Sequence, residues 1–565
     1  MGFLESLDSG ITDFVGQWNG YSTGLVTLLV AIVSYRIVSH REPDVHPLLL
    51  AKQASASTVR NEGESAVYRS HAAPHSMPLN GGLNVKDPGA SKWARGRDGD
   101  LRDVWRKATG ATAGEADKVA RAKISTVLGS EKVVEHRLED ITRQINLIGQ
   151  YIAEQGGIRV AIYLPNSVEF LVTLLACSFY PNLTTVLIPF DVPSDELISM
   201  LRRSAVDTVV TAPGAFPFDT VVSAYPALRQ LIWVVDKGNN HLDWNEIPEG
   251  TGGSVNVATW QEIINDAPTA AGNELPALDS SNVPQDIVTF WQTKQGQMEE
   301  MVRFSQANLV SGISGQLAAI PTKERLGPSD IFLPADSLAN VHTLVLTMAA
   351  LWSNSSVAFT SVAGKSPDLV LATQGIAPTV VVASPATMLK LHKESTARLS
   401  SPLAQASHYL STRALTLEGV LSPANPLSTF AVAARPTIGS TPNKLRLLYV
   451  AERAGTDNPR LLPGVLSDLR IFTGSKIVYA LTAPRVAGAV SQTALYDYRV
   501  DEDGQTHFGA PVTSLEIFLK DSGAHKTTEE KIEGEIFVRG PAVAGGEASL
   551  GVIGRIKDDN TLAYV

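Results

Sequence analysis

The residues that most often carry covalent or metal chemistry are few and scattered in this sequence. The single cysteine, Cys177, lies in the apolar run Phe170–Tyr180, so it can form no internal disulfide and belongs to no cysteine-rich metal site. We interpret it as a small buried hydrophobe. The histidines show no zinc spacing, and there is no Ser-His-Asp nucleophile elbow or dinucleotide-binding glycine fingerprint.

The charge balance argues against a nucleic-acid surface. The chain has 47 Lys and Arg against 57 Asp and Glu, a formal net charge of −10. Nucleic-acid binding depends on clustered cations that neutralise phosphates, so we expect no nucleic-acid partner. With 565 residues, 44% hydrophobic and 18% charged, the chain is long enough for more than one core and too apolar to be largely disordered.

The elements that would position any site begin with an uncharged run near the N-terminus, Phe14–Tyr35. Its most apolar part is Leu25–Val33, and the whole run, as a helix, would cross about 30 Å of hydrocarbon. The run predicts a transmembrane helix at 14–36 after a tail at 1–13. Arg36 and Arg41 follow it, so the positive-inside tendency predicts that the large C-terminal body is cytosolic.

Other interpretations of this run stay open. It could be a helix buried in the protein core. A cleaved signal peptide is disfavoured by Glu5, Asp8 and Asp13, because basic residues are expected there. Gly2 with Ser6 fits a loose N-myristoylation pattern, which would make the membrane contact shallower.

Strands alternate with helices once the chain passes a polar segment. Residues 37–110 are rich in Ser, Gly, Pro, His and charges, which is typical of a linker or a loosely packed extension. Beyond it the pattern predicts strands and helices at Val160–Tyr163, Ser167–Tyr180, Thr184–Pro189, Ser194–Arg203 and Thr208–Thr211. Such alternation predicts an α/β body with a mainly parallel, doubly wound sheet.

The same alternation of strands and helices recurs later in the chain. Pro378–Ser384 reads as a strand, after which Ser384 can cap a helix and Pro385 can open it. Val341–Trp352 is apolar; a buried core helix is favoured there over the lining of an acyl tunnel. Ala397–Asn443 predicts a helix, turns and a surface connection.

The order of segments from Ser65 to Val565 resembles the large domain of the adenylate-forming (AMP-binding) enzymes, including long-chain fatty acid–CoA ligases. The landmarks that carry the resemblance are Ser65–Arg69, Arg159–Ser167, Gln306–Val310, Leu333-Pro334, Pro378–Val380, Leu445-Arg446, Tyr479–Thr482 and Gly534–Pro541. The resemblance implies mixed, doubly wound sheets packed with helices and a small β subdomain, within 111–565. It also implies ATP-dependent acyl adenylation, followed by acyl transfer to a thiol such as coenzyme A.

The phosphate-binding loop implied by the resemblance is degraded. In the family a Ser, Thr and Gly loop closed by Pro-Lys-Gly offers backbone N–H groups, hydroxyls and a lysine to the triphosphate. Here Trp291–Met301 stands in that place. Thr293 and Gly296 keep part of the chemistry, and Lys294 is displaced from the usual lysine position.

Two acidic residues, Glu299 and Glu300, stand where the proline and the lysine are expected. A unit charge pair at 4 Å is worth about 4 kcal/mol at an effective dielectric constant of about 20. Exchanging attraction for repulsion therefore predicts weak phosphate binding. The alternative is that Lys294 or Arg303 supplies the positive charge from another direction.

Three further positions depart from the family's pattern. The family's Tyr-Gly-x-Thr-Glu segment keeps Tyr479 and Thr482, but Ala483 replaces the glutamate that helps to hold magnesium. Residues 451–454 (Ala-Glu-Arg-Ala) replace a Gly-Gly-Ala-Pro turn that lets adenine approach the backbone. Val552 replaces the ribose-binding aspartate and cannot accept hydrogen bonds.

These departures predict a pseudoenzyme of the acyl-CoA synthetase type: a membrane-anchored scaffold, regulator or acyl-binding protein in fatty-acid and lipid metabolism. The endoplasmic reticulum is the expected membrane. The sequence ends about where the family's hinge begins, so the small C-terminal domain is expected to be absent. No catalytic residue, metal ligand or cofactor is expected. The degenerate nucleotide-site positions are Thr293, Lys294, Gly296, Tyr479 and Thr482.

Expected partners are membrane lipid, a fatty acid or acyl-CoA, and a protein. The alternative function is a working long-chain fatty acid–CoA ligase. It would use ATP, Mg and CoA with a rearranged site, or with a small domain that a partner supplies.

Overall fold

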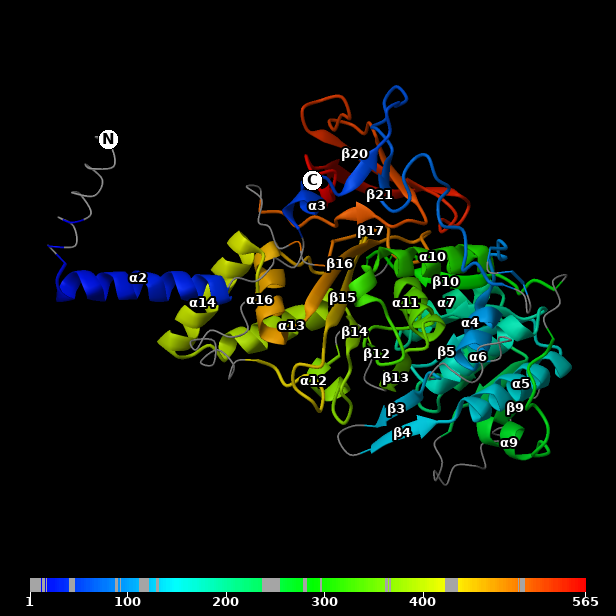
Figure 1. Cartoon of the computed structure of the whole chain (residues 1–565). Coiled ribbons are helices and arrows are strands. Elements are labelled where there is room, and N and C mark those ends of the chain that lie inside the picture. The colour runs from blue at the N-terminus through cyan, green and yellow to red at the C-terminus, as the bar shows by residue number, and fades with distance from the viewer. Residues whose placement is uncertain are drawn as a thin grey trace.

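The structure is a computed structural model. It describes residues 12, 16, 18–39, 46–86, 90–91, 93–110, 121–128, 132–235, 255–277, 282–294, 297–360, 364, 367–421, 435–495, 497 and 504–565, with no side-chain description for 35, 36, 38, 39 and 418. These residues form three β-sheets with helices packed against them (Figure 1).

The first sheet has seven strands in the order β11-β10-β6-β5-β7-β8-β9. Their bounds are β5 Arg159–Tyr163, β6 Thr184–Leu187, β7 Thr208–Thr211, β8 Gln230–Trp233, β9 Asn256–Thr259, β10 Ile287–Trp291 and β11 Glu300–Phe304. Only β11, at one edge, is antiparallel to its neighbour. Strands such as β7 are buried along their whole length, as expected when helices cover both faces of a parallel sheet.

The second sheet has nine strands in the order β18-β17-β16-β15-β14-β12-β13-β3-β4. Their bounds are β3 Ile124–Leu128, β4 Lys132–His136, β12 Ile331–Pro334, β13 Ser356–Thr360, β14 Val380–Ala383, β15 Leu447–Arg453, β16 Lys476–Thr482, β17 Ser491–Gln492 and β18 Ala510–Pro511. The six central strands are parallel and the edge strands antiparallel. Both large sheets confirm the predicted α/β class.

The third sheet has six strands and joins the two ends of the folded body, in the order β1-β2-β19-β20-β21-β22. Their bounds are β1 Ala54–Ala56, β2 Tyr68–Ser70, β19 Glu516–Lys520, β20 Ile532–Arg539, β21 Glu547–Ile556 and β22 Leu562–Tyr564. This sheet corresponds to the small β subdomain that the sequence resemblance implied.

Much of 37–110, predicted to be a linker or a loosely packed extension, is instead folded and packed. Besides β1 and β2, it contains α4 (Leu101–Ala108), whose Trp105 is fully buried. Tyr68 is buried against the C-terminal strands, and Arg69 Nε donates to Glu516 Oε2 at 2.5 Å. The polar composition hid these elements because their buried partners are distant in sequence, 447 positions for Arg69 of β2 and 205 for Leu101 of α4.

Helices cover the faces of the two large sheets. Their bounds are α5 Leu138–Glu154, α6 Val168–Phe179, α7 Ser194–Ser204, α8 Phe218–Ala224, α9 Trp260–Asn265, α10 Gln306–Ala319, α11 Val341–Trp352, α12 Leu369–Ala372, α13 Pro385–Ala397, α14 Pro402–Glu418 and α16 Pro463–Thr473, with a short turn of 3-10 helix at Thr322–Glu324.

Several helix predictions are confirmed. The Ser384 hydroxyl accepts from Thr387 N at 3.2 Å, and Pro385 opens α13. Every residue from His342 to Leu351 on α11 is buried, which confirms a core helix. Cys177 on α6 is buried, and burial raises the pKa of its thiol to about 12.

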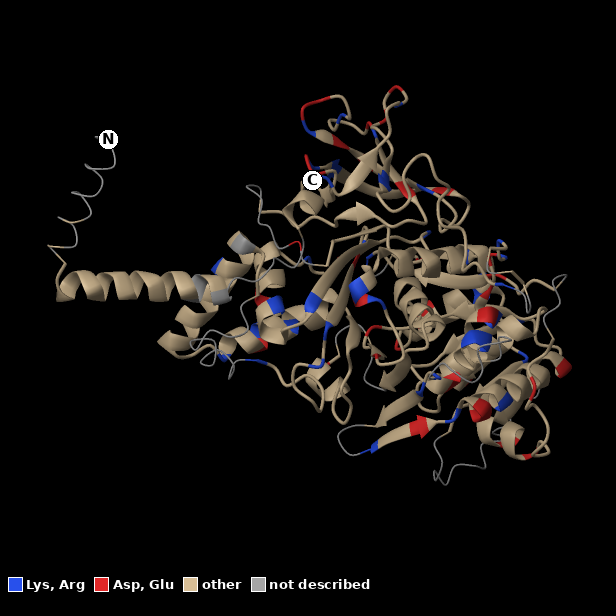
Figure 2. Ribbon diagram, viewed as in Figure 1, with Lys and Arg blue, Asp and Glu red and all other residues tan. Residues whose placement is uncertain are grey.

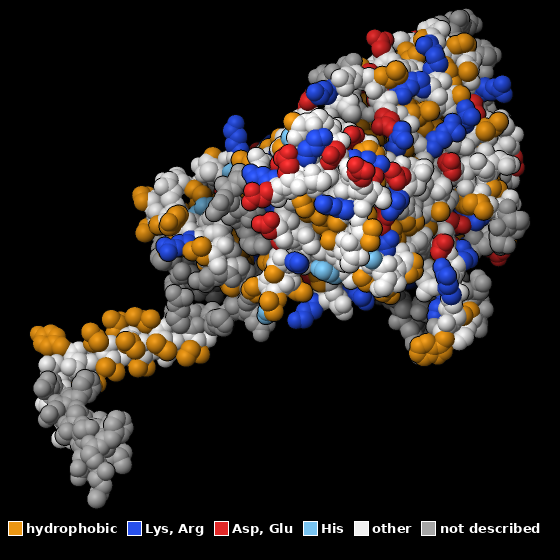
Figure 3. Space-filling model, turned by 90° about the horizontal axis from the view of Figure 1, so that it is seen from above, with side chains coloured by type: hydrophobic (Ala, Val, Ile, Leu, Met, Phe, Trp, Pro, Cys, Tyr) orange, Lys and Arg blue, Asp and Glu red, His pale blue; other side chains and the backbone are white. Residues whose placement is uncertain are grey.

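The N-terminal helix α2 (Gly20–Ser39) projects from the body in Figure 1, and α3 (Pro47–Ala51) follows it. In Figure 3 the projecting arm is covered with hydrophobic side chains. Nevertheless, within the part of the chain that the structure describes, no helix combines the length and the apolar character needed to cross a membrane. The predicted transmembrane helix at 14–36 therefore finds no support in the structure.

Candidate functional site

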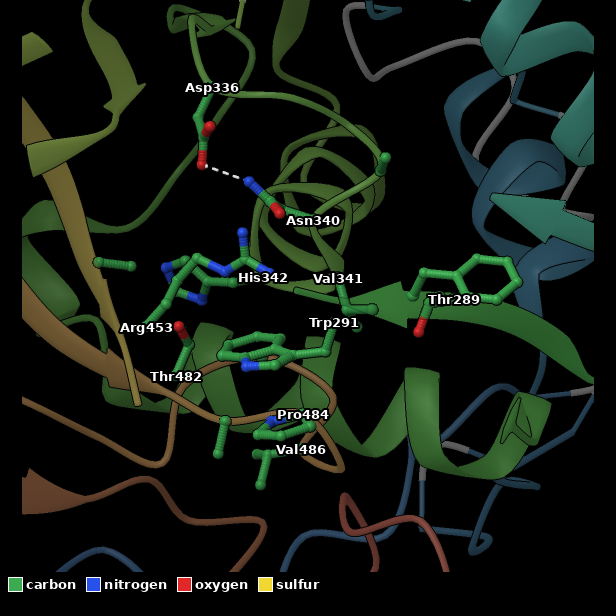
Figure 4. A pocket seen from close by; sticks show the side chains of 15 residues that line it. Thr289, Trp291, Asp336, Asn340, Val341, His342, Arg453, Thr482, Pro484 and Val486 are labelled. Atoms are coloured by element: carbon green, nitrogen blue, oxygen red, sulfur yellow. Dashed lines mark hydrogen bonds between the residues drawn. The ribbon is translucent and has the colours of Figure 1, made fainter. Parts of the chain in front are cut away.

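The carboxyl ends of strands from both large sheets enclose a pocket (Figure 4). The seven-stranded sheet contributes the end of β10, and the nine-stranded sheet contributes β15, β16 and the loop after β12. The residues that matter most for its chemistry are Thr289, Trp291, Asp336, His342, Arg453 and Thr482. In α/β proteins this edge of the sheet is where ligands bind, since the strands end there and the loops are free to vary.

The side chain of Arg453 occupies this pocket. Its guanidinium carbon lies 4.2 Å from the centre of the Trp291 ring, within the range of a cation–π contact. Burial lowers the pKa of Arg453, and the attraction of the nearby Asp336 opposes that shift. Arginine keeps its charge in proteins, so the pocket contains a fixed positive charge.

The remaining space is small. About 30 Å³ is open to water-sized molecules in this pocket. A pocket that encloses a drug-sized ligand typically measures about 300 to 1,000 Å³, whereas about 10 to 15 Å³ is enough for one water. The arrangement with Arg453 on Trp291 thus has room for a few waters, not for a nucleotide.

Several polar groups around the pocket have no hydrogen-bond partner among the described residues. They include both ring nitrogens of His342, the indole nitrogen of Trp291 and Nε of Arg453. Burial lowers the pKa of His342 to about 4, so the ring is neutral at pH 7. Buried polar groups are normally satisfied by protein or by water, so these groups favour a small polar occupant of the pocket.

Asp336 is held firmly at the rim. Its carboxylate accepts from Asn340 Nδ2 at 2.9 Å, from Thr343 Oγ1 at 3.2 Å and from the Ser337 N–H at 2.8 Å. Burial raises the pKa of Asp336, and these hydrogen bonds oppose the rise. The attraction of Arg453 also opposes this rise, so the two side chains influence each other's charge.

Comparison with solved structures identifies the architecture. An anthranilate CoA ligase, AuaEII, solved with anthranoyl-AMP, matches with a TM-score of 0.57 at 12% identity over 82% of this chain and 77% of that chain. A benzoate CoA ligase from Burkholderia xenovorans LB400 matches at 0.55 and 14%, over 82% and 79%. The N-terminal domain of FACL13 from Mycobacterium tuberculosis matches at 0.55 and 13%, over 82% of this chain and 99% of that domain.

The chain has the adenylate-forming fold. At these identities the likeness concerns the fold alone, so substrate and activity remain to be argued from the residues. An uncharacterized protein of Saccharomyces cerevisiae (strain ATCC 204508 / S288c), YHR045W, is 22% identical over 528 residues, which are 88% of this chain and 85% of the yeast protein. No family model matches the chain.

Two predicted nucleotide-site residues of the adenylate-forming fold, Tyr479 and Thr482, lie on opposite faces of β16. Thr482 lines the pocket, and its hydroxyl donates to the Glu452 carbonyl at 2.9 Å. Tyr479 faces the other side, stacks on Phe508 with ring centres 5.4 Å apart, and donates its hydroxyl to the Glu452 carboxylate. Tyr479 is fully buried and offers no surface to a ligand in the pocket.

The remaining predicted positions lie in the connection between β10 and β11. The Thr293 hydroxyl donates to Gln297 Oε1 at 3.0 Å, and Lys294 is exposed. Neither residue lines the pocket. Gly296 lies outside the described residues. Of the four predicted positions that the structure describes, only Thr482 lies at the pocket wall.

The acidic pair in this connection is not free to repel a phosphate as expected. Glu299 is buried and accepts from Arg203 Nη1 at 3.1 Å, and Arg203 Nη2 also donates to the Glu299 carbonyl at 2.5 Å. Glu300 Oε1 accepts from Arg485 Nε at 2.8 Å. The value of about 4 kcal/mol for a charge pair assumed uncompensated carboxylates, so it overstates the repulsion that either residue exerts on a phosphate.

Magnesium and ATP do not fit the residues at this pocket. Ala483 lines it where the adenylate-forming fold would supply a magnesium-binding glutamate, and a methyl group cannot ligate a hard cation. Among the described residues, no group of three or more His, Cys, Asp or Glu is arranged to hold a metal ion. Val552, at the ribose position, lies near the Gly455 turn, 3.9 Å from where a Cβ there would be.

The sequence missed Asp336 and His342 entirely. A signal for them was present, because Asp336 follows a short buried strand and His342 lies in the first turn of the apolar helix after it. Segments at the carboxyl ends of parallel strands form ligand sites. Trp291 and Arg453 were named only as members of replaced motifs. Their mutual contact joins residues that are 162 positions apart, and no local pattern predicts it.

Proposed function

We propose that this chain is a non-catalytic relative of the acyl-CoA ligases, which acts as a scaffold, regulator or acyl-binding protein in lipid metabolism. The observation that carries the proposal is the position of Arg453, stacked on Trp291 inside the pocket. A cation–π contact of this kind is worth about 2 kcal/mol when it is desolvated. A nucleotide would have to displace the guanidinium from Trp291 and from the field of Asp336 before it could bind.

The losses at other positions support the same proposal. Ala483 and Val552 remove the oxygens that would hold magnesium and ribose in the adenylate-forming fold. Each loss alone would weaken binding of Mg-ATP. Ala483 affects the metal, Val552 the ribose, and Arg453 the space for the base. Accordingly, we propose no catalytic residue and no resident ATP, magnesium or coenzyme A.

The neutralised acidic pair favours the second candidate, a working fatty acid–CoA ligase. Arg203 and Arg485 compensate Glu299 and Glu300, so the connection between β10 and β11 is less repulsive to phosphate than the sequence predicts. Such an enzyme would use ATP, Mg and CoA and would need Arg453 to swing out, with a partner supplying further groups. We rank it second because it requires that rearrangement.

Membrane lipid is the partner that we propose for the N-terminal region. The apolar side chains of α2 are exposed on all sides of the helix, including the consecutive residues Leu28, Leu29 and Val30. Such a helix is stable only when protein or lipid covers it. We propose that it associates with a membrane, that of the endoplasmic reticulum by preference, with the folded body in the cytosol.

The nucleotide part of the proposal can be tested by calorimetry. The full-length protein in detergent is titrated with Mg-ATP and, separately, with a non-hydrolysable fatty-acyl adenylate mimic. We expect no saturable heat from the wild type with either ligand. Arg453→Gly should gain weak binding of the mimic, because the substitution frees the Trp291 face and the surrounding volume.

Arg460→Gly is the matched control, since Arg460 stacks on Tyr564 at 4.3 Å and does not line the pocket. It should bind no better than the wild type. A parallel titration with a long-chain fatty acid tests acyl binding, which should be indifferent to added nucleotide. Tight Mg-ATP binding by the wild type, or release of pyrophosphate with fatty acid and ATP, would reject the proposal in favour of the ligase.

A further inference from the structure

Helix α14 exposes a line of leucines to solvent. Leu403, Leu410 and Leu417 are 56%, 44% and 72% exposed. They are spaced seven residues apart, so in a helix of 3.6 residues per turn they lie along one side. We call them the leucine stripe. The opposite side of α14 is the packed one, with Ala404 and Leu415 buried.

Side-chain contacts fix α14, which carries the leucine stripe, to the neighbouring helices α13 and α16. Asp468, on α16, accepts from His392 Nε2 of α13 at 2.9 Å and from His408 Nε2 of α14 at 2.8 Å. His408 also stacks on Phe472 of α16, with ring centres 4.8 Å apart. These contacts join three helices, so α14 presents its leucines from a packed layer rather than from a loose segment.

The charge around the leucine stripe has the opposite sign to that of the whole chain. Exposed cations on and after α13 and on α14 are Lys390, Lys393, Arg398 and Arg413. The acidic residues of α13 and α14 are the exposed Glu394 and, at the end of α14, Glu418. Lys390 is compensated by Asp368 at 3.6 Å, and the other three cations still outnumber the two carboxylates, in a chain of net charge −10. Figure 2 shows several Lys and Arg positions in blue on the ribbons of this helical layer, with a few acidic positions in red among them.

The leucine stripe and the exposed helix α2 lie toward the same end of the molecule. In Figure 1 α2 projects from the side of the body that carries α14, and Figure 3 shows the same arm projecting from one end of the body. An apolar line flanked by cations is the combination that binds the interface of an anionic bilayer. A single weak anchor gives marginal binding, and a second apolar and basic contact makes it durable.

We propose that α14 is a second membrane contact, in which the leucine stripe enters the interface of a bilayer that carries anionic lipid. This inference rests on the proposed membrane association of α2 and adds an orientation to it. The helical layer of α13, α14 and α16 faces the lipid, and the pocket lies on the folded body behind it.

The test places a fluorescent reporter on the stripe in the full-length chain. Cys177 is buried, so a polarity-sensitive thiol dye labels an introduced cysteine selectively. Leu410→Cys reports on α14, and Met298→Cys, at a position 74% exposed near the connection between β10 and β11, is the control. Labelled protein is mixed with vesicles of phosphatidylcholine alone or with added phosphatidylserine, and flotation of the protein is measured in parallel.

We expect a blue shift of the dye at position 410 with the anionic vesicles and none at position 298. Replacing Lys393 and Arg413 with Glu should weaken the response about fivefold or more per residue at low salt, and raised salt should have the same effect. Leu403→Gln with Leu417→Gln should reduce the shift at position 410 while flotation through α2 persists.

The outcomes separate the two proposals. Absence of flotation in the wild type would reject membrane association through α2. Flotation without a shift at position 410 would leave that association standing and reject the second contact. A shift that depends on protein concentration and appears without vesicles would show that a second copy covers the leucine stripe, which would also overturn the inference.

Discussion

Glu300 shows how an ion-pair partner changes the effect of a charged side chain on its surroundings. Glu300 and Arg485 form an ion pair of 2.8 Å, and more than a third of each side chain is exposed. We predict that Glu300→Lys produces no thioester synthesis from fatty acid, ATP and CoA, because Arg453 still occupies the pocket and the new cation faces Arg485. The free energy of unfolding should change by less than about 1 kcal/mol, as is usual for exposed pairs.

A coupled pyrophosphate-release assay and denaturant unfolding measure these two effects. Arg485→Glu is the matched control, since it also places two like charges together at the same pair. Thioester synthesis by Glu300→Lys alone would mean that one charge disables the site and that the pocket residues matter little.

Glu452 is a buried carboxylate whose partners lie on two sides. The Tyr479 hydroxyl donates to it, and Arg460 Nε lies 3.5 Å from its Oε1. Burial raises the pKa of Glu452, and the hydrogen bond from Tyr479 opposes this. We predict that Tyr479→Phe lowers the free energy of unfolding by about 1 to 3 kcal/mol, the usual cost of leaving a buried polar group unpaired.

The pH dependence of that loss has a definite sign. Without the Tyr479 donor the pKa of Glu452 rises further, so the deficit should be larger at pH 7.5 than at pH 4.5, where protonation relieves it. Tyr449→Phe is the matched control on the neighbouring strand, because the buried Tyr449 hydroxyl has no partner among the described residues. Equal losses for the two variants in urea unfolding would contradict a specific role for the Glu452 hydrogen bond.

At the scale of elements, the layer of α13, α14 and α16 depends on one carboxylate. Burial alone would raise the pKa of Asp468, but hydrogen bonds from His392 and His408 lower it to about 2. The stability that ionised Asp468 gives to the fold is therefore fully present above pH 3.8, the ordinary pKa of an aspartate, and is lost as the pH falls from 3.8 towards 2.

We predict that over this pH window the free energy of unfolding falls by roughly 2 kcal/mol more for the wild type than for Asp468→Asn. One pKa unit corresponds to about 1.4 kcal/mol. Urea unfolding at intervals between pH 5 and pH 2.5 measures the two slopes. Asp368→Asn, at an exposed carboxylate paired with Lys390, should keep the slope of the wild type. Parallel slopes for the wild type and Asp468→Asn would show that the two histidines do not depend on the ionised carboxylate.

At the scale of the whole molecule, the N-terminal strands complete a sheet made of the last strands of the chain. Tyr68 is 3% exposed and pairs with Ile517, while Arg69 binds Glu516. We predict that removing residues 1–45 leaves the melting temperature unchanged, because the described side chains of α2 are exposed. Removing 1–72 should lower it by several degrees, since burial of Tyr68 alone is worth about 2 kcal/mol.

Thermal unfolding of the two shortened chains, followed by circular dichroism, checks this prediction. The longer deletion should also promote aggregation, because it uncovers the edge of β19. Equal melting temperatures for the two deletions would mean that the third sheet is stable without β1 and β2.

The sequence by itself determined the elements whose causes are local. The strands and helices between Arg159 and Thr211, the Ser384 cap and the burial of Cys177 follow from periodicity, capping and apolar runs within a few residues. The order of these elements was enough to predict the α/β class, and the adenylate-forming fold was implied by the resemblance of the motifs between Ser65 and Val565. The replacements at Ala483, Arg453 and Val552 are also visible in the sequence, because they are read against a known pattern of motifs.

The tertiary structure alone decided what those replacements do. Arg453 meets Trp291 from another sheet, and Glu299 and Glu300 find arginines on other elements. The pairing of β2 with β19 was equally hidden, because a polar segment gives no local sign of a buried partner far along the chain. Short-range propensity determines which elements form, but charge compensation and occupancy of a pocket depend on which distant side chains the packing brings within a few ångströms.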